Sequence, residues 1–123
     1  MNDHCAFHYN ADYEWHVTQV MVRQERVKLL VPDYVPFDFL PLHRRFSSII
    51  SWLTRHRTFI HQSTLAQLER RGLPSEKQKT TLLSVRLEQA NTFELLIRSQ
   101  APQRYIILAF DEHFELIHGQ VEC

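Results

Sequence analysis

Apolar residues in the middle of the chain recur at helical spacing. They fall at i, i+4, i+7, i+8 and i+11 and so line one side of a helix, the members of this stripe being Leu42, Phe46, Ile49, Ile50 and Leu53. This pattern predicts a helix over residues 42–57. A shorter helix is predicted over residues 64–71, with Ser63 as its N-cap. Gly72 would end it in a left-handed conformation, and Pro74 would prevent its continuation.

After Thr80 the apolar residues recur at every second position, which is typical of β-strands. The predicted strands are short and separated by turn-forming residues, and they cover residues 83–88, 93–98, 105–110 and 114–121. Residues 105–110 are nearly all apolar, which indicates a central strand covered on both faces. The pattern therefore predicts a four-stranded antiparallel meander at the C-terminal end.

The segment before the helices fits two interpretations. Some apolar residues of 13–30 also fit helical spacing, but β-branched and aromatic residues dominate and Gln24 interrupts the helical stripe. We favour strands here, most firmly over residues 26–31. An extended segment then leads to the helices, as predicted by Pro32, Pro36 and Pro41. The expected fold class is α+β, with a two-helix hairpin packed on one face of an antiparallel sheet that has a C-terminal β-meander.

A chain of 123 residues with two glycines and five prolines indicates one ordered domain, residues 1–123, with fraying confined to residues 1–12. No apolar run approaches the roughly 20 residues of a membrane helix, and the N-terminus is acidic and polar where a secretory signal would be basic and then apolar. We therefore expect a cytoplasmic protein without a membrane partner. Cys5 and Cys123 lie at opposite ends of the chain, so reduced thiols are expected.

The net charge of zero conceals a basic middle segment. Residues 41–79 hold eight basic and two acidic residues, while each flank holds three basic and six acidic residues. The predicted helices could thus present a basic binding surface made up of Arg44, Arg45, Arg55, Arg57, Arg70 and Arg71. Trp52 lies off the apolar stripe, where it could be an exposed interface anchor or could pack beneath the proline-rich segment. An ordinary solvated helix face is the other interpretation of these charges.

Residues 86–119 present a recognisable order of residue types. Arg86-Leu87 is followed by Phe93-Glu94-Leu95 with Arg98, then by Arg104-Tyr105-Ile106-Ile107, Asp111 and Leu116-Ile117-His118-Gly119. This order resembles the C-terminal half of the HigB/RelE family of toxin–antitoxin ribonucleases. The resemblance covers less than a third of the chain. It implies a small sheet with two helices packed on it ahead of the meander, in agreement with the periodicity.

The resemblance also implies metal-independent cleavage of messenger RNA, with the catalytic roles falling on Arg98, Arg104, Tyr105 and His118. The two arginines would clamp a phosphate, the histidine would serve as acid or base, and the tyrosine would stack a base or orient the phosphate. Structural roles account for the same residues: cross-strand ion pairs for the arginines, a turn position for the histidine and a core position for the tyrosine.

Departures from the family pattern decide between these alternatives. Leu96 stands where the family usually has arginine, Arg104-Tyr105 reverses the usual order, and "QVEC" replaces the lysines that often follow His-Gly. Each change removes or moves a positive charge from the expected RNA face. We therefore predict a non-catalytic interaction protein, such as an inhibitor or adaptor encoded by a phage or other mobile element. It would bind a macromolecular partner, protein ahead of RNA or other nucleic acid, through the basic helices. The alternative prediction is an mRNA-cleaving toxin.

Neither a cofactor nor a metal site is expected. His4, Cys5 and His8 form the one cluster of potential metal ligands, and it lacks a second half at zinc-site spacing. With glycine only at positions 72 and 119, the chain has no phosphate-binding glycine loop and no Gly-x-Ser-x-Gly nucleophile elbow.

Overall fold

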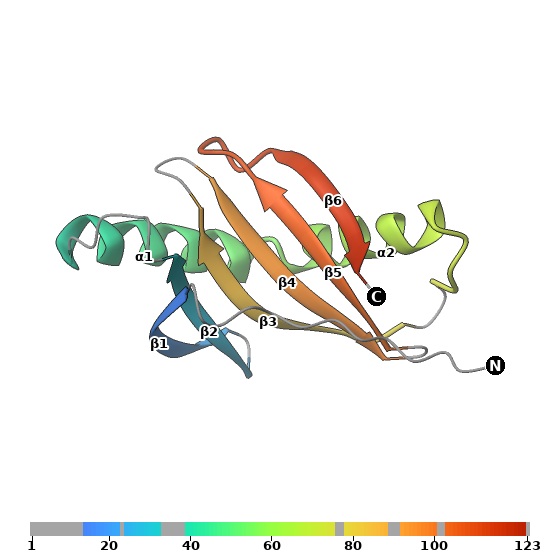
Figure 1. The fold of residues 1–123 in the computed structure, drawn as a ribbon, viewed down its shortest axis with the longest axis horizontal. Helices are drawn as coiled ribbons and strands as arrows, with labels where there is room; N and C mark the ends of the chain where they lie inside the picture. Colours follow the sequence, from blue (N-terminus) through green and yellow to red (C-terminus); the bar gives the residue numbers. More distant parts are fainter. Residues whose placement is uncertain are drawn as a thin grey trace.

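Six strands and two helices make up the fold in the computed structural model, which describes residues 14–22, 24–32, 39–75, 78–88, 92–100 and 103–122. Only the backbone is described for residues 14–19, 32 and 39–43. The strands are β1 (Glu14–Val22), β2 (Glu25–Pro32), β3 (Thr80–Leu87), β4 (Phe93–Gln100), β5 (Gln103–Phe110) and β6 (Leu116–Glu122), and the helices are α1 (Phe39–Arg55) and α2 (Arg57–Arg70). The predicted α+β class is confirmed (Figure 1).

The strands lie in the sheet in chain order, from β1 to β6. Every neighbouring pair is antiparallel except β2–β3, which is parallel because the chain crosses over through both helices between these strands. The predicted meander is confirmed as β3–β6, and the strand interpretation of residues 13–30 is confirmed as the β1–β2 pair. Gln24, which interrupted the helical stripe, lies in the turn between β1 and β2 with a φ of 72°.

Both helices pack on one face of the sheet, and in Figure 1 they lie end to end across it, with a bend where a hairpin would reverse the chain. The bend is at His56, whose ring lies 2.8 Å (Nδ1) from the Trp52 carbonyl. A carbonyl oxygen only accepts, so the ring donates this hydrogen bond. The predicted N-cap, Ser63, is wrong, because α2 already begins at Arg57 and places Ser63 in its interior.

The ends of the helices follow local backbone chemistry. Helix α1 begins at Phe39, so the prediction of extended chain as far as Pro41 is wrong at its end. Pro41 is tolerated because the first turn of a helix needs no N–H donor. Helix α2 ends as predicted, with Gly72 at a φ of 68° and the Leu73 N–H donating to the Leu68 carbonyl at 2.9 Å.

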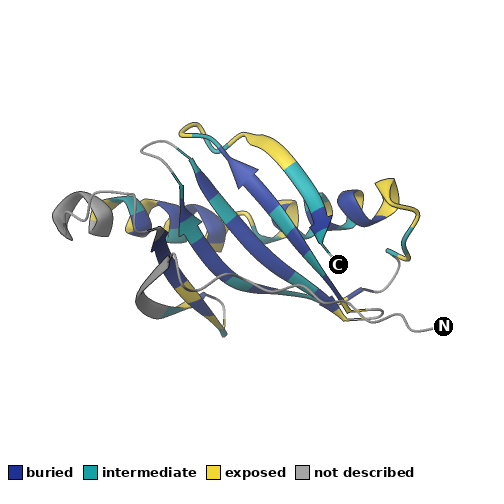
Figure 2. Cartoon of the chain, viewed as in Figure 1, coloured by how far each residue is buried: buried dark blue, intermediate teal, exposed yellow. Residues whose placement is uncertain are grey.

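The hydrophobic core lies between the helices and the inner face of the sheet (Figure 2). Trp52 is 8% exposed and stacks on Phe114 at a ring distance of 4.9 Å, with Phe110 at 5.3 Å. The interpretation of Trp52 as an exposed interface anchor is therefore wrong. The indole extends the core because the bend at His56 and the turn before β6 bring further aromatic rings beside it.

Strand β5 lies between β4 and β6, which confirms the predicted interior position, but the predicted cover on both faces is complete only on the inner one. Its inner side chains are fully buried, among them Ile106 and Leu108, while Tyr105 and Ile107 on the outer face are half-buried. The outer face of the sheet is thus more polar and more open than the inner one.

Candidate functional site

The four residues implied by the ribonuclease resemblance do not gather in one place. Arg98 lies opposite Tyr105 across the β4–β5 pair, and Arg104 lies opposite Ser99. Opposed residues share a face and successive residues alternate, so Arg98 and Tyr105 project from the outer face and Arg104 projects from the inner face. Arg104 is also 9% exposed. The two arginines therefore cannot clamp one phosphate, which corrects the expectation that both lie on the polar face.

His118 lies on the outer face but away from Arg98. His118 is opposite Ala109 of β5. Ala109 and Tyr105 are four residues apart on this strand, which is about 13 Å at about 3.3 Å per residue. The Nε2 of His118 lies 2.9 Å from the Gln120 side-chain oxygen. The register thus brings together Arg98 and Tyr105, and it leaves Arg104 and His118 apart from them.

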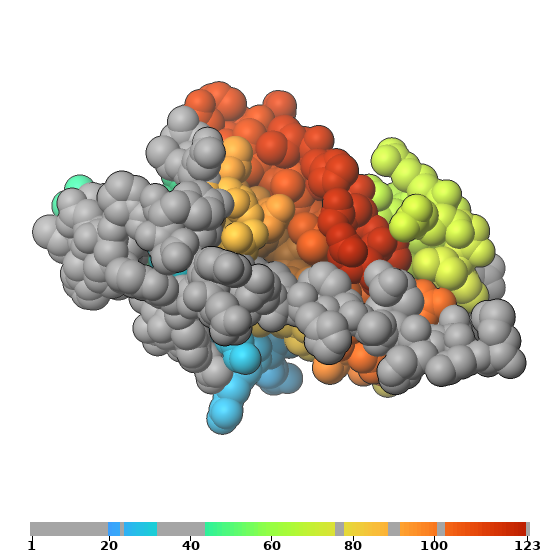
Figure 3. Space-filling view, viewed as in Figure 1, coloured from blue at the N-terminus to red at the C-terminus, as the bar shows by residue number. Residues whose placement is uncertain are grey.

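The predicted basic surface of the helices divides into exposed and fixed arginines. Arg44, Arg55 and Arg70 are exposed. Arg71 is exposed too, and it donates to the Val121 carbonyl of β6 at 3.2 Å, where α2 and β6 lie side by side (Figure 3). Four of the six predicted arginines are therefore exposed, and the sequence could not tell these four from the other two.

Arg45 and Arg57 hold the helices to the sheet. The Arg45 guanidinium donates to the Thr92 carbonyl at 3.2 Å, and Arg57 forms an ion pair with Glu25. Burial lowers the pKa of Arg45, although the nearby Glu112 carboxylate raises it. These two side chains are half-buried and are used in contacts within the protein. The arginine surface open to a partner is therefore smaller than the sequence suggested.

A small cavity of about 250 Å³ lies beside Arg45. Its apolar walls come from α1, β4 and the turn before β6, and its polar rim carries Arg45, Asp111 and Glu112. The Asp111 carboxylate accepts the backbone N–H groups of His113 (2.8 Å) and Glu115 (3.0 Å), so it shapes the turn. Of the charged groups in this rim, the Asp111 carboxylate is therefore already used by the fold.

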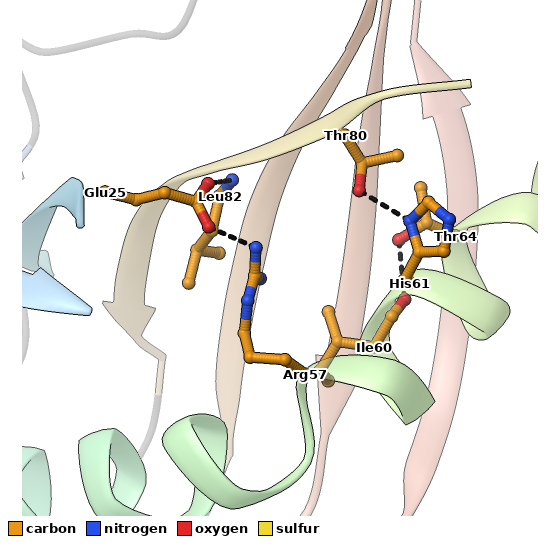
Figure 4. A network of polar contacts seen from close by, with 7 residues as sticks. All are labelled: Glu25, Arg57, Ile60, His61, Thr64, Thr80 and Leu82. Carbon is orange, nitrogen blue, oxygen red and sulfur yellow. Dashed lines mark hydrogen bonds and ion pairs between the residues drawn. The ribbon is translucent and has the colours of Figure 1, made fainter. Parts of the chain in front are cut away.

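A larger open groove of about 600 Å³ lies where β3 begins beside α2 (Figure 4). Its walls come from β2, α2, the segment before β3 and the end of β4, and the lining residues are Glu25, Arg57, Thr58, His61, Gln78, Lys79, Thr80, Thr81 and Gln100. Sequence reasoning missed most of this groove. The only local signals are the i, i+4 spacing of Arg57 and His61 and the polar run before Leu82.

Glu25 fixes the geometry of the groove. One of its carboxylate oxygens binds Arg57 of α2, and the other accepts the Leu82 backbone N–H of β3 at 2.7 Å. Leu82 is next to a register irregularity of the β3–β4 pair. The carboxylate therefore joins β2, β3 and α2 and holds the Arg57 guanidinium in place (Figure 4).

His61 and Thr80 form a second contact across the groove. The ring Nδ1 lies 2.8 Å from the threonine hydroxyl, and the pair joins α2 to the first residue of β3 (Figure 4). Behind His61, the Thr64 hydroxyl donates to the Ile60 carbonyl at 2.8 Å. Lys79 precedes Thr80 and is exposed. The groove is thus lined by cations, hydroxyls and amides, and two side-chain contacts fix the positions of Arg57, His61 and Thr80 among them.

The outer face carries a compact charge cluster on β3 and β4. Arg86 forms ion pairs with both Glu88 and Glu94, the second at 3.2 Å. Burial, followed by the hydrogen bond and charge of Glu88, raises the pKa of Glu94 to about 7, although Arg86 acts in the opposite direction. The single positive charge of Arg86 thus faces two carboxylates, Glu88 and Glu94. This arrangement favours the retention of one proton by the two carboxylates together.

Comparisons with protein-family models, with curated proteins and with solved structures found no match. Within the described ranges, no three His, Cys, Asp or Glu side chains are arranged to hold a metal ion, and His4, Cys5 and His8 lie outside those ranges. Neither α1 nor α2 combines the length and apolar character needed to cross a membrane.

Proposed function

We propose that the protein is a non-catalytic binding protein that contacts the phosphate backbone of a nucleic acid through the solvent face of α1 and α2. One observation carries the proposal: residues 39–71 contain six arginines, no lysine and a single acidic residue, Glu69. The most exposed of these arginines are Arg44, Arg55, Arg70 and Arg71. Arginine binds phosphate with two parallel hydrogen bonds, which lysine cannot form.

The exposed residues between these arginines favour a nucleic acid over an acidic protein. They are mainly hydroxyl and amide side chains, namely Ser47, Ser48, Ser51, Thr54, Thr58 and Gln62. Such groups, together with arginine, make most of the contacts to phosphate and sugar in protein–nucleic acid complexes. The centre of a protein interface is instead apolar, and Phe59 is the one large exposed hydrophobic residue in the described part of the helices.

Spacing along α1 suits a backbone that carries repeated charges. Arg44 and Arg55 are eleven residues apart, which is about 16 Å along the axis, and Ser48 and Ser51 lie between them on the same side. An α-helix of this kind can follow successive phosphates without reading bases. The ribonuclease alternative has no comparable support, because Arg98 and Arg104 lie on opposite faces of the sheet.

Fluorescence anisotropy with labelled single-stranded RNA and double-stranded DNA of about 20 nucleotides tests this proposal. We expect binding in the micromolar range that weakens steeply with salt. The double variant Arg44→Gln/Arg55→Gln should bind about tenfold more weakly, with a log–log salt slope shallower by about 1.5 to 2. The matched control is Arg26→Gln/Lys28→Gln, which removes two exposed charges from β2 and should change the affinity less than about twofold.

Two outcomes would overturn the proposal. The first is the absence of salt-dependent binding to either nucleic acid at protein concentrations up to about 1 mM. The second is an equal loss of affinity in the helix variant and the β2 control, which would assign binding to overall charge and not to the helices.

A further inference from the structure

We propose that the groove between the start of α2 and the start of β3 is a phosphate-binding site. The phosphate group could belong to a nucleic-acid backbone or to a small phosphorylated molecule. The first source rests on the function proposed above, and the second does not. Thr58 connects the groove with the helical surface, since it lines the groove, is exposed and follows Arg55 by three residues.

Charge is the first argument for an anionic ligand. Glu25 is the only carboxylate among the described lining residues, and both of its oxygens are already used by Arg57 and by the Leu82 backbone N–H. The Glu25 charge is therefore offset within the protein. Lys79 adds a positive charge that no other acidic residue in the described part of the lining balances, and His61 can add another when protonated.

Hydrogen-bond donors are the second argument. When the His61 ring is neutral with its proton on Nε2, Thr80 donates to Nδ1 and the Nε2–H is left for a ligand. When the ring carries its proton on Nδ1, or is charged, the ring donates to Thr80 and the hydroxyl proton is left for a ligand. The pair thus presents a donor in every protonation state. Lysine, threonine and glutamine groups add further donors along the same groove.

The shape of the groove indicates phosphate and not a nucleobase. Its volume of about 600 Å³ accommodates a phosphate with an attached sugar, but none of the lining residues that the structure describes is an aromatic one on which a base could stack. The Arg57 guanidinium and the His61–Thr80 pair are also fixed in advance, because Glu25 joins α2 to β2 and β3 and His61 joins α2 to Thr80. A preorganised set of donors loses little conformational entropy on binding an oxyanion.

Titration with inorganic phosphate, followed by ¹H–¹⁵N NMR at constant ionic strength with chloride as the reference anion, tests the site. We expect saturable shifts at residues 57–61 and 78–81. Lys79→Gln should weaken phosphate binding at least about fivefold, whereas Lys28→Gln, the same change at an exposed position on β2, should alter it less than about twofold. Thr80→Val should weaken binding about threefold or more, and Thr80→Ser should restore it because the hydroxyl returns.

Absence of saturable shifts, or equal affinities in Lys79→Gln and Lys28→Gln, overturns the phosphate site. The same variants in the anisotropy assay separate the two proposals. If phosphate binds through Lys79 but no nucleic acid binds, the groove is retained for a small phosphorylated ligand and the proposed function fails. If nucleic acid binds through Arg44 and Arg55 while Lys79→Gln behaves like Lys28→Gln in both the anisotropy assay and the phosphate titration, the function is retained and the groove fails.

Discussion

Glu94 should make the stability of the protein decrease as the pH rises towards neutrality. Its pKa is raised from an ordinary value of 4.5 to about 7, first by burial and then by the hydrogen bond and charge of Glu88. Between these two pH values the folded protein binds a proton that the unfolded chain has released. The contribution of Glu94 is therefore fully present below about pH 4.5 and is lost as the pH rises through about 7.

The size of this effect follows from the pKa change and the exposure of the side chain. At about 1.4 kcal/mol for each pKa unit, a rise from 4.5 to about 7 corresponds to at most about 3.5 kcal/mol. The Glu94 side chain is 27% exposed, so water screens part of this energy. Glu94→Gln imitates the protonated form and leaves Arg86 paired with Glu88. Its stability relative to the native chain should increase by about 1–2 kcal/mol between pH 5 and pH 8.5.

Urea denaturation at pH 5.0 and pH 8.5, followed by tryptophan fluorescence, measures this difference. Glu115→Gln removes an exposed carboxylate near the β5–β6 turn and should change the free energy of unfolding by less than about 0.5 kcal/mol at either pH. If the difference in the free energy of unfolding between Glu94→Gln and the native chain is the same at both pH values, or shifts in favour of the native chain from pH 5.0 to pH 8.5, the reasoning is refuted. Glu94 would then be held as a carboxylate by Arg86.

Three further changes test the packing. Trp52→Ala should lower the free energy of unfolding, measured by urea denaturation, by about 3–5 kcal/mol, because it empties the space between Phe110 and Phe114. A decrease below about 1 kcal/mol would contradict the burial of the indole. Glu25→Gln should cost about 1–3 kcal/mol and speed amide exchange at Leu82, an effect that Glu115→Gln should lack. Gly119→Ala should cost about 1–2 kcal/mol, because its Cβ would lie 2.5 Å from the buried Gln67 amide. Adding Gln67→Ala to Gly119→Ala should restore most of the lost free energy of unfolding. If the effects of the two substitutions on that free energy simply add, the contact between position 119 and Gln67 is contradicted.

Local patterns explain which parts of the fold were predictable. The stripe of α1 and the end of α2 at Gly72 depend on residues close in sequence, and both were predicted. The bend at His56 was not, because neither a proline nor a glycine marks that position in the sequence. The parallel β2–β3 pair was also missed, since alternation shows that a strand exists but not which strand lies beside it.

Register explains the error at the expected ribonuclease site. Gln100 pairs with Gln103, which sets Arg98 opposite Tyr105 and puts Arg104 on the other face. A shift of one residue in the β4–β5 register would have placed Arg98 and Arg104 on the same face. Periodicity alone does not fix a register to that precision. The groove was missed for a related reason, because its lining comes from segments that only the tertiary structure brings together.

The parallel β2–β3 pair also affects the order in which the strands of the sheet form and separate. Only residues Lys28 to Leu30 pair with Ser84 to Arg86, whereas β4 and β5 pair along their whole length. Joining β2 to β3 closes a loop that contains both helices, at an entropic cost that the meander, built from adjacent segments, avoids. The β1–β2 pair should therefore join a sheet that has already formed and detach from it first. Amide exchange in β2 should then report a partial unfolding in which β4 and β5 stay protected.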